Sequence, residues 1–385
     1  MNVLIIQRMI PDYRMAFFQS LHSKLASDGI SLKVLTGVGR QEEFLQDTMG
    51  NMSFATRTRN VSLLGESYWT LHSWEMASHS DMVIVEQAVA PLQNIAFVLR
   101  RETQSLFRRG HHPLIAFWGH GMDLAPGVRH RLADGFKRLV LTKADWWFAY
   151  TSRSQQYVIA AGYPRDRVTN VNNSTDVDSL RNALFAVSKQ RMNQLFRSLF
   201  PQDRLSSCMV AMFCSRLIER KDVPLMLKSA GLIHNHLPSF RLIIIGDGPF
   251  RSLVQEFCNV NDWCVFVGKI SGLARAPYLK MSDVWLCPGG VGLEVIDAFA
   301  AGLPFCTTWH DRHSPEVVYI SNGINGLITK QDATQYSDAV AKLLSSDAKL
   351  RQMKSNAARD SKQYGIEQMA NRFRIGILQC LKHDT

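Results

Sequence analysis

Short apolar runs alternate with segments that carry apolar residues at helical spacing along most of the chain. Short apolar runs indicate buried parallel strands, and the spaced pattern indicates amphipathic helices. In the first part of the chain the predicted strands are residues 2–7, 31–36, 81–85, 113–118, 145–151 and 168–171. One predicted helix begins shortly after Pro11, and three more cover residues 92–108, 131–143 and 152–161. This alternation predicts a parallel sheet covered by helices on both faces.

The same pattern restarts in the second part of the chain. The predicted strands lie at residues 208–213, 240–245, 264–267, 283–287, 305–308 and 326–329, and helices lie at 224–234, 253–260 and 293–301. Residues 331–381 have a wholly helical pattern. We therefore predict two α/β domains, at residues 1–180 and 206–365, with a linker at 181–205 and a final helix at 366–385. For the final helix, packing back on the N-terminal domain is one of the arrangements that we consider.

The composition is that of a large globular protein without a membrane-spanning segment. Hydrophobic residues make up 46% of the 385 residues, and no apolar run approaches the ~20 residues that span a bilayer. The N-terminus begins with a strand pattern and has no basic region ahead of it, so we expect no signal peptide. The seven cysteines lie between Cys208 and Cys380 without Cys-x-x-Cys spacing. Such a set indicates buried thiols in a reducing compartment, and we expect a cytoplasmic protein.

The charge balance indicates an anionic partner. The formal net charge is +11, which suits a nucleotide, a phospholipid surface or nucleic acid. The excess is densest from Arg100 to Lys143, with nine basic and three acidic residues. Because no nucleic-acid-binding motif accompanies it, we expect no nucleic-acid partner. We predict peripheral contact of this basic segment with an anionic membrane surface, while Trp146 and Trp147 lie in a predicted strand and fit the core.

The stretch from Pro288 to Pro304 carries the main candidate chemistry. A predicted strand leads into Gly289, Gly290 and Gly292, and a helix pattern follows at once. A strand, a glycine loop and a helix N-terminus in this order present backbone N–H groups, here those of Gly292 and Leu293, to a phosphate or sugar oxygen. An ordinary tight turn between strand and helix is the alternative interpretation.

Further motifs surround this loop in a characteristic order. They are Ser215-Arg216-Leu217-Ile218-Glu219-Arg220-Lys221, Gly246-Asp247-Gly248-Pro249, Val267-Gly268, Ser314-Pro315-Glu316-Val317-Val318 and Asn322-Gly323-Ile324-Asn325-Gly326-Leu327. The set resembles the nucleotide-sugar domain of family 4 glycosyltransferases, which are retaining enzymes. The resemblance covers nearly the whole chain. It implies a GT-B fold, in which two Rossmann-like, doubly wound α/β domains face a central cleft.

The N-terminal half resembles this family more weakly. The segment Ile10-Pro11-Asp12-Tyr13-Arg14 resembles the acceptor-side start of such enzymes, which makes Tyr13 and Arg14 candidates for substrate binding. His120 stands between two glycines at the end of a predicted strand, where the family often has a histidine loop. A neutral imidazole there can hydrogen-bond a sugar hydroxyl or the acceptor. A satisfied structural histidine is the alternative.

The resemblance also implies roles for residues of the second domain. Arg216 and Lys221 match the family's pair of cations, which stabilise the negative charge that builds up on a leaving diphosphate. Arg220 is interpreted as a neighbour without a role. Gly268, Gly292 and Leu293 fall at positions that contact the donor.

One position departs from the family pattern. The family usually has two glutamates separated by seven residues across the glycine loop, and here those positions are Gly289 and Asp297. The first carboxylate, which contacts the transferred sugar in the family, is absent, so the choice of donor and activity itself are open. The second, which accepts hydrogen bonds from the ribose, is one methylene shorter. Glu294 shares the helix face of Asp297 and is a further candidate.

The sequence predicts no metal or cofactor. Asp176-Val177-Asp178 has the spacing of a metal-binding pair, but no preceding strand aims these carboxylates at a site, and no spacing suits zinc. We predict a retaining, metal-independent glycosyltransferase that moves a sugar from a nucleoside diphosphate to a glycan or lipid-linked acceptor. The expected setting is the inner membrane face of a bacterium that makes surface polysaccharide such as lipopolysaccharide. The alternatives are a non-catalytic nucleotide-sugar or glycan-binding partner and a GT-B nucleotide-sugar epimerase.

Overall fold

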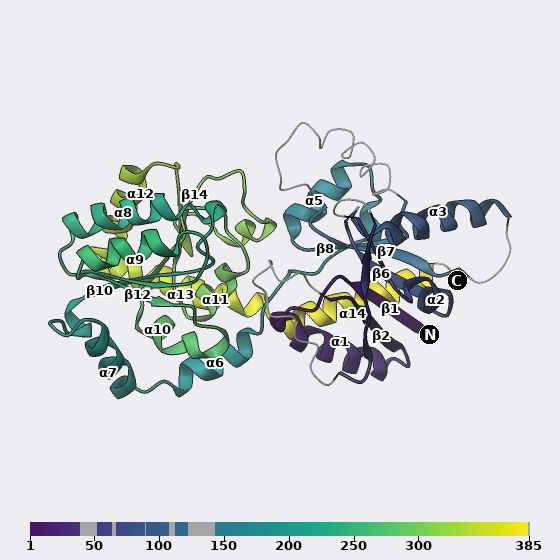
Figure 1. Ribbon diagram of the computed structural model, residues 1–385, viewed down its shortest axis with the longest axis horizontal. Helices are drawn as coiled ribbons and strands as arrows, with labels where there is room; N and C mark the ends of the chain where they lie inside the picture. Colours follow the sequence, from purple (N-terminus) through teal and green to yellow (C-terminus); the bar gives the residue numbers. More distant parts are fainter. Residues whose placement is uncertain (39–51, 64–66, 89, 108–111, 122–142, 384–385) are drawn as a thin grey trace. The chain divides into compact units, whose positions relative to one another are not determined.

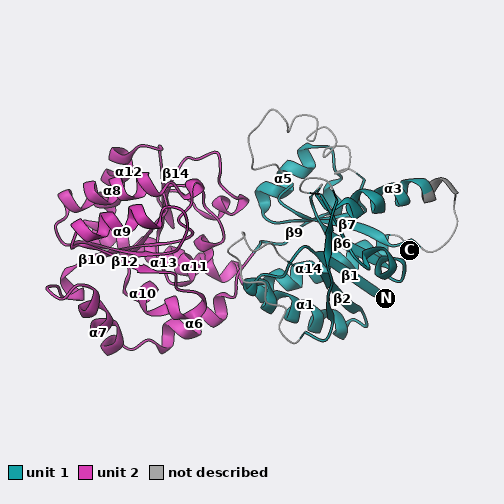
Figure 2. Cartoon of the chain, viewed as in Figure 1, with its two compact units in different colours: residues 1–173, 366–385 teal, residues 174–365 magenta. Residues whose placement is uncertain are grey.

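The computed structural model describes residues 1–38, 52–63, 67–88, 90–107, 112–121 and 143–383. The chain divides into two compact units (Figure 2). Unit 1 contains residues 1–173 and 366–385, and unit 2 contains residues 174–365. None of the described helices is both long enough and apolar enough to cross a membrane.

Unit 1 is built on a seven-stranded parallel sheet. Along the sheet the strands are β3 (Ala55–Arg57), β2 (Ser31–Thr36), β1 (Asn2–Gln7), β6 (Met82–Glu86), β7 (Leu114–Gly119), β8 (Trp146–Ala149) and β9 (Val168–Asn170). The order reverses at β1, because β2 and β3 lie on one side of it and the later strands on the other. Ligands of such sheets bind beyond the carboxyl ends of the strands near the reversal. A separate antiparallel pair joins β4 (Asn60–Ser62) and β5 (Tyr68–Thr70).

Helices cover both faces of this sheet (Figure 1). On one face, α1 (Met15–Ser27) and α14 (Ile366–His383) bury their apolar sides against the strands. On the other face lie α2 (Ser73–Ser78), α3 (Leu92–Phe107) and α5 (Ser152–Ala160). The predicted helix at residues 131–143 lies outside the described residues, except for Lys143.

The C-terminal helix α14 is an integral part of unit 1. The ring of Phe373 stacks on Phe148 with centroids 4.4 Å apart, and it meets Phe17 and Trp118 edge-on at 5.0 and 4.8 Å. A Cβ atom at Gly376 would lie 2.5 Å from Thr169 Oγ1, so this glycine allows the helix to approach the sheet closely. The unit therefore closes its core with residues that are about 350 positions away from α1 in the sequence.

Unit 2 repeats the architecture with a six-stranded parallel sheet. Its strands, in spatial order, are β12 (Cys264–Gly268), β11 (Phe240–Ile245), β10 (Met209–Cys214), β13 (Val284–Leu286), β14 (Phe305–Thr308) and β15 (Gly326–Thr329). One face is covered by α6 (Val177–Ala186), α7 (Lys189–Leu199), α10 (Ala276–Met281) and α11 (Glu294–Ala300). The other is covered by α8 (Val223–His236), α9 (Arg251–Val260), α12 (Ala333–Leu344) and α13 (Asp347–Asp360).

The prediction of a linker at residues 181–205 is wrong. These residues contain most of α6 and all of α7, and Leu184, Phe196 and Phe200 are buried in the core of unit 2. The segment is polar overall but places its apolar side chains on one face of each helix, and only the sheet beneath reveals that this face is covered. The units divide between Asn173 and Ser174, a few residues before the predicted boundary.

Removal of the Phe373 side chain should destabilise unit 1. Phe373→Ala leaves a cavity among three aromatic rings, and truncation of a buried phenylalanine costs about 3–5 kcal/mol of unfolding free energy. Ile375→Ala on the same helix is the matched control, because Ile375 is 41% exposed. The measurement is urea unfolding followed by tryptophan fluorescence. If the two variants unfold at the same urea concentration, α14 does not contribute to the core as described.

Candidate functional site

The glycine loop, residues 288–293, lies between β13 and α11 and is held by side chains of neighbouring elements. Thr308 Oγ1 donates a hydrogen bond to the carbonyl oxygen of Pro288 at 2.6 Å. His313 Nδ1 accepts the N–H of Val291 at 2.9 Å, and its Nε2 lies 2.8 Å from the carbonyl oxygen of Thr308. Because Nδ1 accepts a hydrogen bond, the neutral imidazole carries its proton on Nε2. These bonds fix the loop at the carboxyl end of the sheet.

The backbone of the glycine loop also packs directly on the turn that follows β10. A Cβ atom at Gly289 would lie 2.3 Å from the carbonyl carbon of Lys221, and one at Gly290 would lie 2.7 Å from the carbonyl oxygen of Arg312. The N–H of Gly290 donates to the carbonyl oxygen of Arg220 at 2.7 Å. No side chain fits at Gly289 without a shift of backbone. The missing first carboxylate is therefore a property of this backbone packing and is not reversed by a simple Gly289→Glu substitution.

Lys221 lies beneath the loop with its charge already compensated. It ends the short 3-10 helix η5 (Glu219–Lys221) and is only 3% exposed. Its Nζ donates to the carbonyl oxygen of Gly290 at 2.6 Å and forms an ion pair with Glu294 Oε1. The following residue, Asp222, adopts a left-handed conformation and caps α8, which turns the chain sharply and aims Lys221 inward.

Glu294 is the counter-ion of Lys221 and was not predicted in that role. Its Oε1 also accepts the N–H of Gly292 at 3.1 Å. Burial by itself raises the pKa of Glu294, but the Lys221 ammonium and the hydrogen bonds more than offset this, so the pKa lies below its ordinary value. The predicted phosphate donor Gly292 is thus bonded to a carboxylate, and α11 begins at Glu294, one residue after Leu293. A diphosphate at this loop would compete with Glu294 for the Lys221 ammonium and for the N–H of Gly292.

Two neighbouring arginines of the turn after β10 lie in different environments. Arg216 is exposed and, among the residues that the structure describes, no acidic residue forms an ion pair with it. Arg220, interpreted from the sequence as a neighbour without a role, donates from Nη2 to the carbonyl oxygen of Val291 at 3.1 Å and to Ser314 Oγ at 2.9 Å. Arg220 thus ties the glycine loop to the segment around Ser314, and its predicted lack of a role in donor binding stays a prediction.

Asp297 is buried, in contrast to an ordinary aspartate on a helix surface. It is 7% exposed, its Oδ1 accepts a hydrogen bond from Thr175 Oγ1 at 2.9 Å, and its Oδ2 pairs with Arg275 Nη2 at 2.9 Å. Burial would lower the pKa of Arg275, but Asp297 holds it above its ordinary value. The contact of Asp297 with a ribose stays a prediction. Gly268, a further predicted contact, ends β12 in the left-handed region at φ 81°.

The neighbouring carboxylates of the Asp-x-Asp string have structural partners. Asp176 accepts the N–H of Ser179 at 3.0 Å and caps α6. Asp178 pairs with Arg181 at 2.7 Å one turn along the same helix. Both carboxylates therefore stabilise the start of α6.

The predicted residues of unit 1 come together at the carboxyl edge of its sheet. Arg14 is 5% exposed, and its guanidinium carbon lies 4.8 Å from the ring centre of Trp118 and 5.6 Å from that of Tyr150. The ring of His120 meets Tyr150 edge-on at 4.5 Å. Tyr13 lies beside Arg14 at 5.3 Å. The sequence motifs located Tyr13, Arg14 and His120, but nothing in the pattern singled out Tyr150 as the ring that Arg14 and His120 share.

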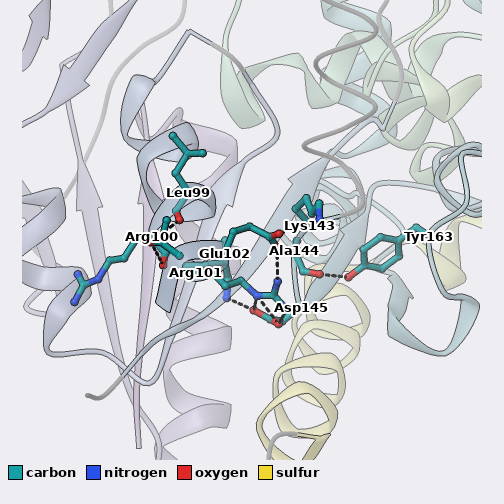
Figure 3. Close-up of polar contacts among 10 residues, drawn as sticks. Leu99, Arg100, Arg101, Glu102, Lys143, Ala144, Asp145 and Tyr163 are labelled. Carbon is teal, nitrogen blue, oxygen red and sulfur yellow. Dashed lines mark hydrogen bonds and ion pairs between the residues drawn. The ribbon is translucent and has the colours of Figure 1, made fainter. Parts of the chain in front are cut away.

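The basic segment predicted to contact a membrane is partly neutralised within unit 1 (Figure 3). Arg101 donates to both carboxylate oxygens of Asp145, and Lys143 pairs with Glu102 at 2.9 Å. The guanidinium of Arg100 stacks over Trp74 at 4.8 Å. The other six of the nine basic residues lie outside the described residues. Trp146 and Trp147 are buried core residues, so membrane contact through this segment stays a prediction.

Comparison with known proteins identifies relatives of both the sequence and the fold. Residues 209–346 match the family profile of glycosyl transferases group 1. The alpha-monoglucosyldiacylglycerol synthase of Acholeplasma laidlawii is 23% identical over 124 residues, which are 31% of this chain. The match spans only 30% of the length of that relative.

Solved structures are similar over essentially the whole chain. A glycosyltransferase from Rickettsia africae has a TM-score of 0.72 at 12% identity and covers 100% of this chain and 99% of its own. HepE of Anabaena, in complex with UDP, has a TM-score of 0.68 at 15% identity and covers 98% of this chain and 100% of its own. The predicted GT-B fold is confirmed. At this level of identity the solved structures show the fold alone, and the family match is confined to residues 209–346 of unit 2.

The Lys221–Glu294 pair should give the protein a defined acid sensitivity. Because the folded-state pKa of Glu294 is below its ordinary value of 4.5, its ionised form stabilises the fold above pH 4.5, and this contribution is lost as the pH falls further. Glu294→Gln should cost about 3–5 kcal/mol at neutral pH, because Lys221 stays buried and unpaired. It should also flatten the fall in stability below pH 4.5.

The measurement for this pair is urea unfolding across the acid range. Glu256→Gln serves as the control, because Glu256 is exposed on α9. Its stability should follow that of the native protein at every pH. Parallel acid profiles of the native and Glu294→Gln proteins would contradict the assigned ion pair.

A methyl group at Gly289 should disrupt the loop. Gly289→Ala forces backbone apart, since its Cβ would lie 2.3 Å from the carbonyl carbon of Lys221. We expect a loss of several degrees in melting temperature. Gly231→Ala on α8 is the control, because nothing lies within 4 Å of that position, and alanine is favoured over glycine within a helix. An equal melting temperature for the two variants would show that the loop is not packed as described.

Proposed function

We propose that the protein is a retaining, metal-independent glycosyltransferase that moves a hexosyl group from a nucleoside diphosphate sugar to a glycan or lipid-linked acceptor. The observation that carries this proposal is the pair of cations in the turn after β10, in the unit that contains the match to group 1 glycosyltransferases. Buried Lys221 and exposed Arg216 follow the same strand, β10. They offer one fixed and one accessible positive charge to a diphosphate.

The chemistry requires such charges. When the bond between the anomeric carbon and the β-phosphate oxygen breaks, its electron pair remains on that oxygen. Preorganised cations and N–H donors that face this oxygen lower the barrier, and removal of one such group typically costs about 3–4 kcal/mol. Arg216 can move onto a bound diphosphate without breaking an ion pair among the described residues. Lys221 and the N–H of Gly292 can bind it by exchange with Glu294.

The remaining parts of the proposal concern the donor and the setting. The buried carboxylate of Asp297, oriented by Thr175 and Arg275, retains lone pairs for ribose hydroxyls. HepE contains UDP, which supports a nucleoside diphosphate as the ligand class. The relative from Acholeplasma laidlawii is named for glycolipid synthesis, which supports lipid-linked acceptors among those to be tested. We infer a role in bacterial surface polysaccharide synthesis, with the protein peripheral to the inner membrane face.

A second candidate function is that of a non-catalytic nucleotide-sugar-binding partner. Two observations favour it. Gly289 leaves no room for the family's first carboxylate, and Lys221 already has an internal counter-ion in Glu294. A binder of this kind would retain affinity for the nucleotide without turning over the sugar.

The test combines binding with turnover. A panel of UDP, GDP, ADP and dTDP sugars is screened by thermal shift, since a ligand that binds only the folded state raises the melting temperature. The stabilising donor is then assayed for hydrolysis and for transfer to glycans and lipid-linked sugars. We expect both stabilisation and turnover. Stabilisation without turnover would favour the non-catalytic function, and no stabilisation by any donor would reject both.

Substitution of the cations should separate their roles. Arg216→Ala should lower kcat/KM for the donor by ~100-fold, with an unchanged melting temperature. Because Lys221→Ala strands Glu294, the double variant Lys221→Met with Glu294→Gln tests Lys221 in a charge-neutral background. Lys228→Ala, which removes an exposed cation from α8 of the same unit, is the control and should behave as the native protein. Equal activities of the Arg216→Ala and Lys228→Ala variants would remove Arg216 from the site.

A further inference from the structure

We infer that Arg14 binds an oxyanion carried by the acceptor, a phosphate or a carboxylate on a sugar, at the carboxyl edge of the unit 1 sheet. This inference rests on the proposed function, because it assigns the acceptor to unit 1. The juxtaposition that carries it is a buried guanidinium surrounded by aromatic rings, without a carboxylate partner among the described residues.

The environment of Arg14 is unusual for a buried cation. The side chain is 5% exposed, and its one hydrogen bond among the described residues is to the thioether sulfur of Met369 at 3.8 Å, a weak acceptor. The nearest acidic residue in sequence, Asp12, is exposed and accepts the N–H of Tyr13 at 2.8 Å. Buried charges in proteins are normally paired, because an unpaired one loses its hydration without compensation.

Two further cations that are shielded from solvent lie in unit 2, the buried Lys221 and the half-buried Arg275, whose side chain is 21% exposed. Lys221 pairs with Glu294, and Arg275 pairs with Asp297. Arg14 alone of these three has rings in place of a carboxylate. Cation–π contact with Trp118 and Tyr150 offsets part of the cost of burial, but it leaves the in-plane N–H donors of the guanidinium available. Those donors form the planar fork that suits a carboxylate or a phosphate.

The position of Arg14 in the fold is that of a ligand contact. It follows β1, the strand at which the sheet order reverses, while Trp118 and Tyr150 lie at the carboxyl ends of β7 and β8. His120 follows β7 and shares the ring of Tyr150. Parallel sheets of this kind collect their ligands at this edge. The half-buried rings of Tyr13 and Tyr150 beside the guanidinium supply apolar surface for the ring of a sugar that bears the oxyanion.

The alternative is that Arg14 only bridges aromatic side chains in the core. The two readings predict opposite effects on stability. If Arg14 serves to bind a ligand, its unpaired buried charge destabilises the free protein. Arg14→Met should then leave the melting temperature unchanged or raise it. If Arg14 is a structural bridge, the loss of its cation–π contacts should lower the melting temperature. A lower value would overturn the inference.

Direct binding provides the second test. The full chain is titrated with glucose 6-phosphate, glucuronate and glucose, followed by calorimetry. We expect both anions to bind and glucose to bind at least ~10-fold more weakly, since hydrogen bonds to charged groups are worth about a tenfold change or more. Whichever of the two anions binds more tightly identifies the oxyanion as a phosphate or a carboxylate. Equal affinity for glucose and the anions, or no binding of either anion, would overturn the inference.

Matched variants locate the binding at Arg14. Arg14→Gln should weaken anion binding by at least ~10-fold, and Arg14→Lys should restore part of it, because the charge remains and the fork is lost. Arg153→Gln is the control, since Arg153 is an exposed cation on α5 of the same unit. Anion affinity that is equal in the native and Arg14→Gln proteins would overturn the inference.

The charge-neutral Lys221→Met, Glu294→Gln variant distinguishes anion binding at Arg14 from anion binding at the glycine loop. This variant should bind the anions as the native protein does. Loss of anion binding in that variant would place the anions at the glycine loop and overturn the inference. Failure of every nucleotide sugar to bind would reject the proposed function while leaving Arg14-dependent anion binding measurable. Conversely, turnover of a donor with a KM for the acceptor that is unchanged by Arg14→Gln would reject only the inference.

Discussion

The close packing of the glycine loop on the turn after β10 is the constraint on which the candidate site depends. Backbone meets backbone at Gly289 and Lys221, at a distance that excludes even a methyl group. This contact places the Lys221 ammonium beneath the loop and Glu294 beside it. A residue with a side chain at position 289 would separate the two segments and with them the charges. The absent family carboxylate and the buried ion pair are therefore two consequences of one packing arrangement.

Charge compensation divides the functional side chains into two groups. Lys221 and Arg275 have carboxylate partners within unit 2, so their positions are fixed before any ligand binds. Arg216 and Arg14 have no such partner among the described residues. Fixed ion pairs hold the geometry of a site. A cation without a carboxylate partner instead favours the binding of an anion, because it gains charge-assisted hydrogen bonds when the anion replaces its water or aromatic contacts.

Local patterns were sufficient where the signal is local. The strands at residues 2–7 and 31–36 have their predicted bounds, because short runs rich in apolar residues are typical of strands in a covered parallel sheet. The glycine motif was also located correctly, since only glycine permits so close an approach of two backbones. The linker prediction failed for residues 181–205, because amphipathic helices with a mainly polar composition resemble a connection until their covered face is known. The pattern of the turn did not reveal that Arg220 bonds to the glycine loop, since neighbouring arginines in a turn differ only in the direction of their side chains.

The sequence by itself determined the α/β class of the fold, the positions of most strands and several of the residues that could form a site. These follow from periodicity and residue type, which are properties of short segments. Only the tertiary structure decided which of those residues are paired. Glu294 and Lys221 are 73 positions apart, Arg14 and Met369 are 355 apart, and Asp297 and Thr175 are 122 apart. Whether a charge is compensated depends on atoms that the chain brings together from such distances, and no local pattern encodes that meeting.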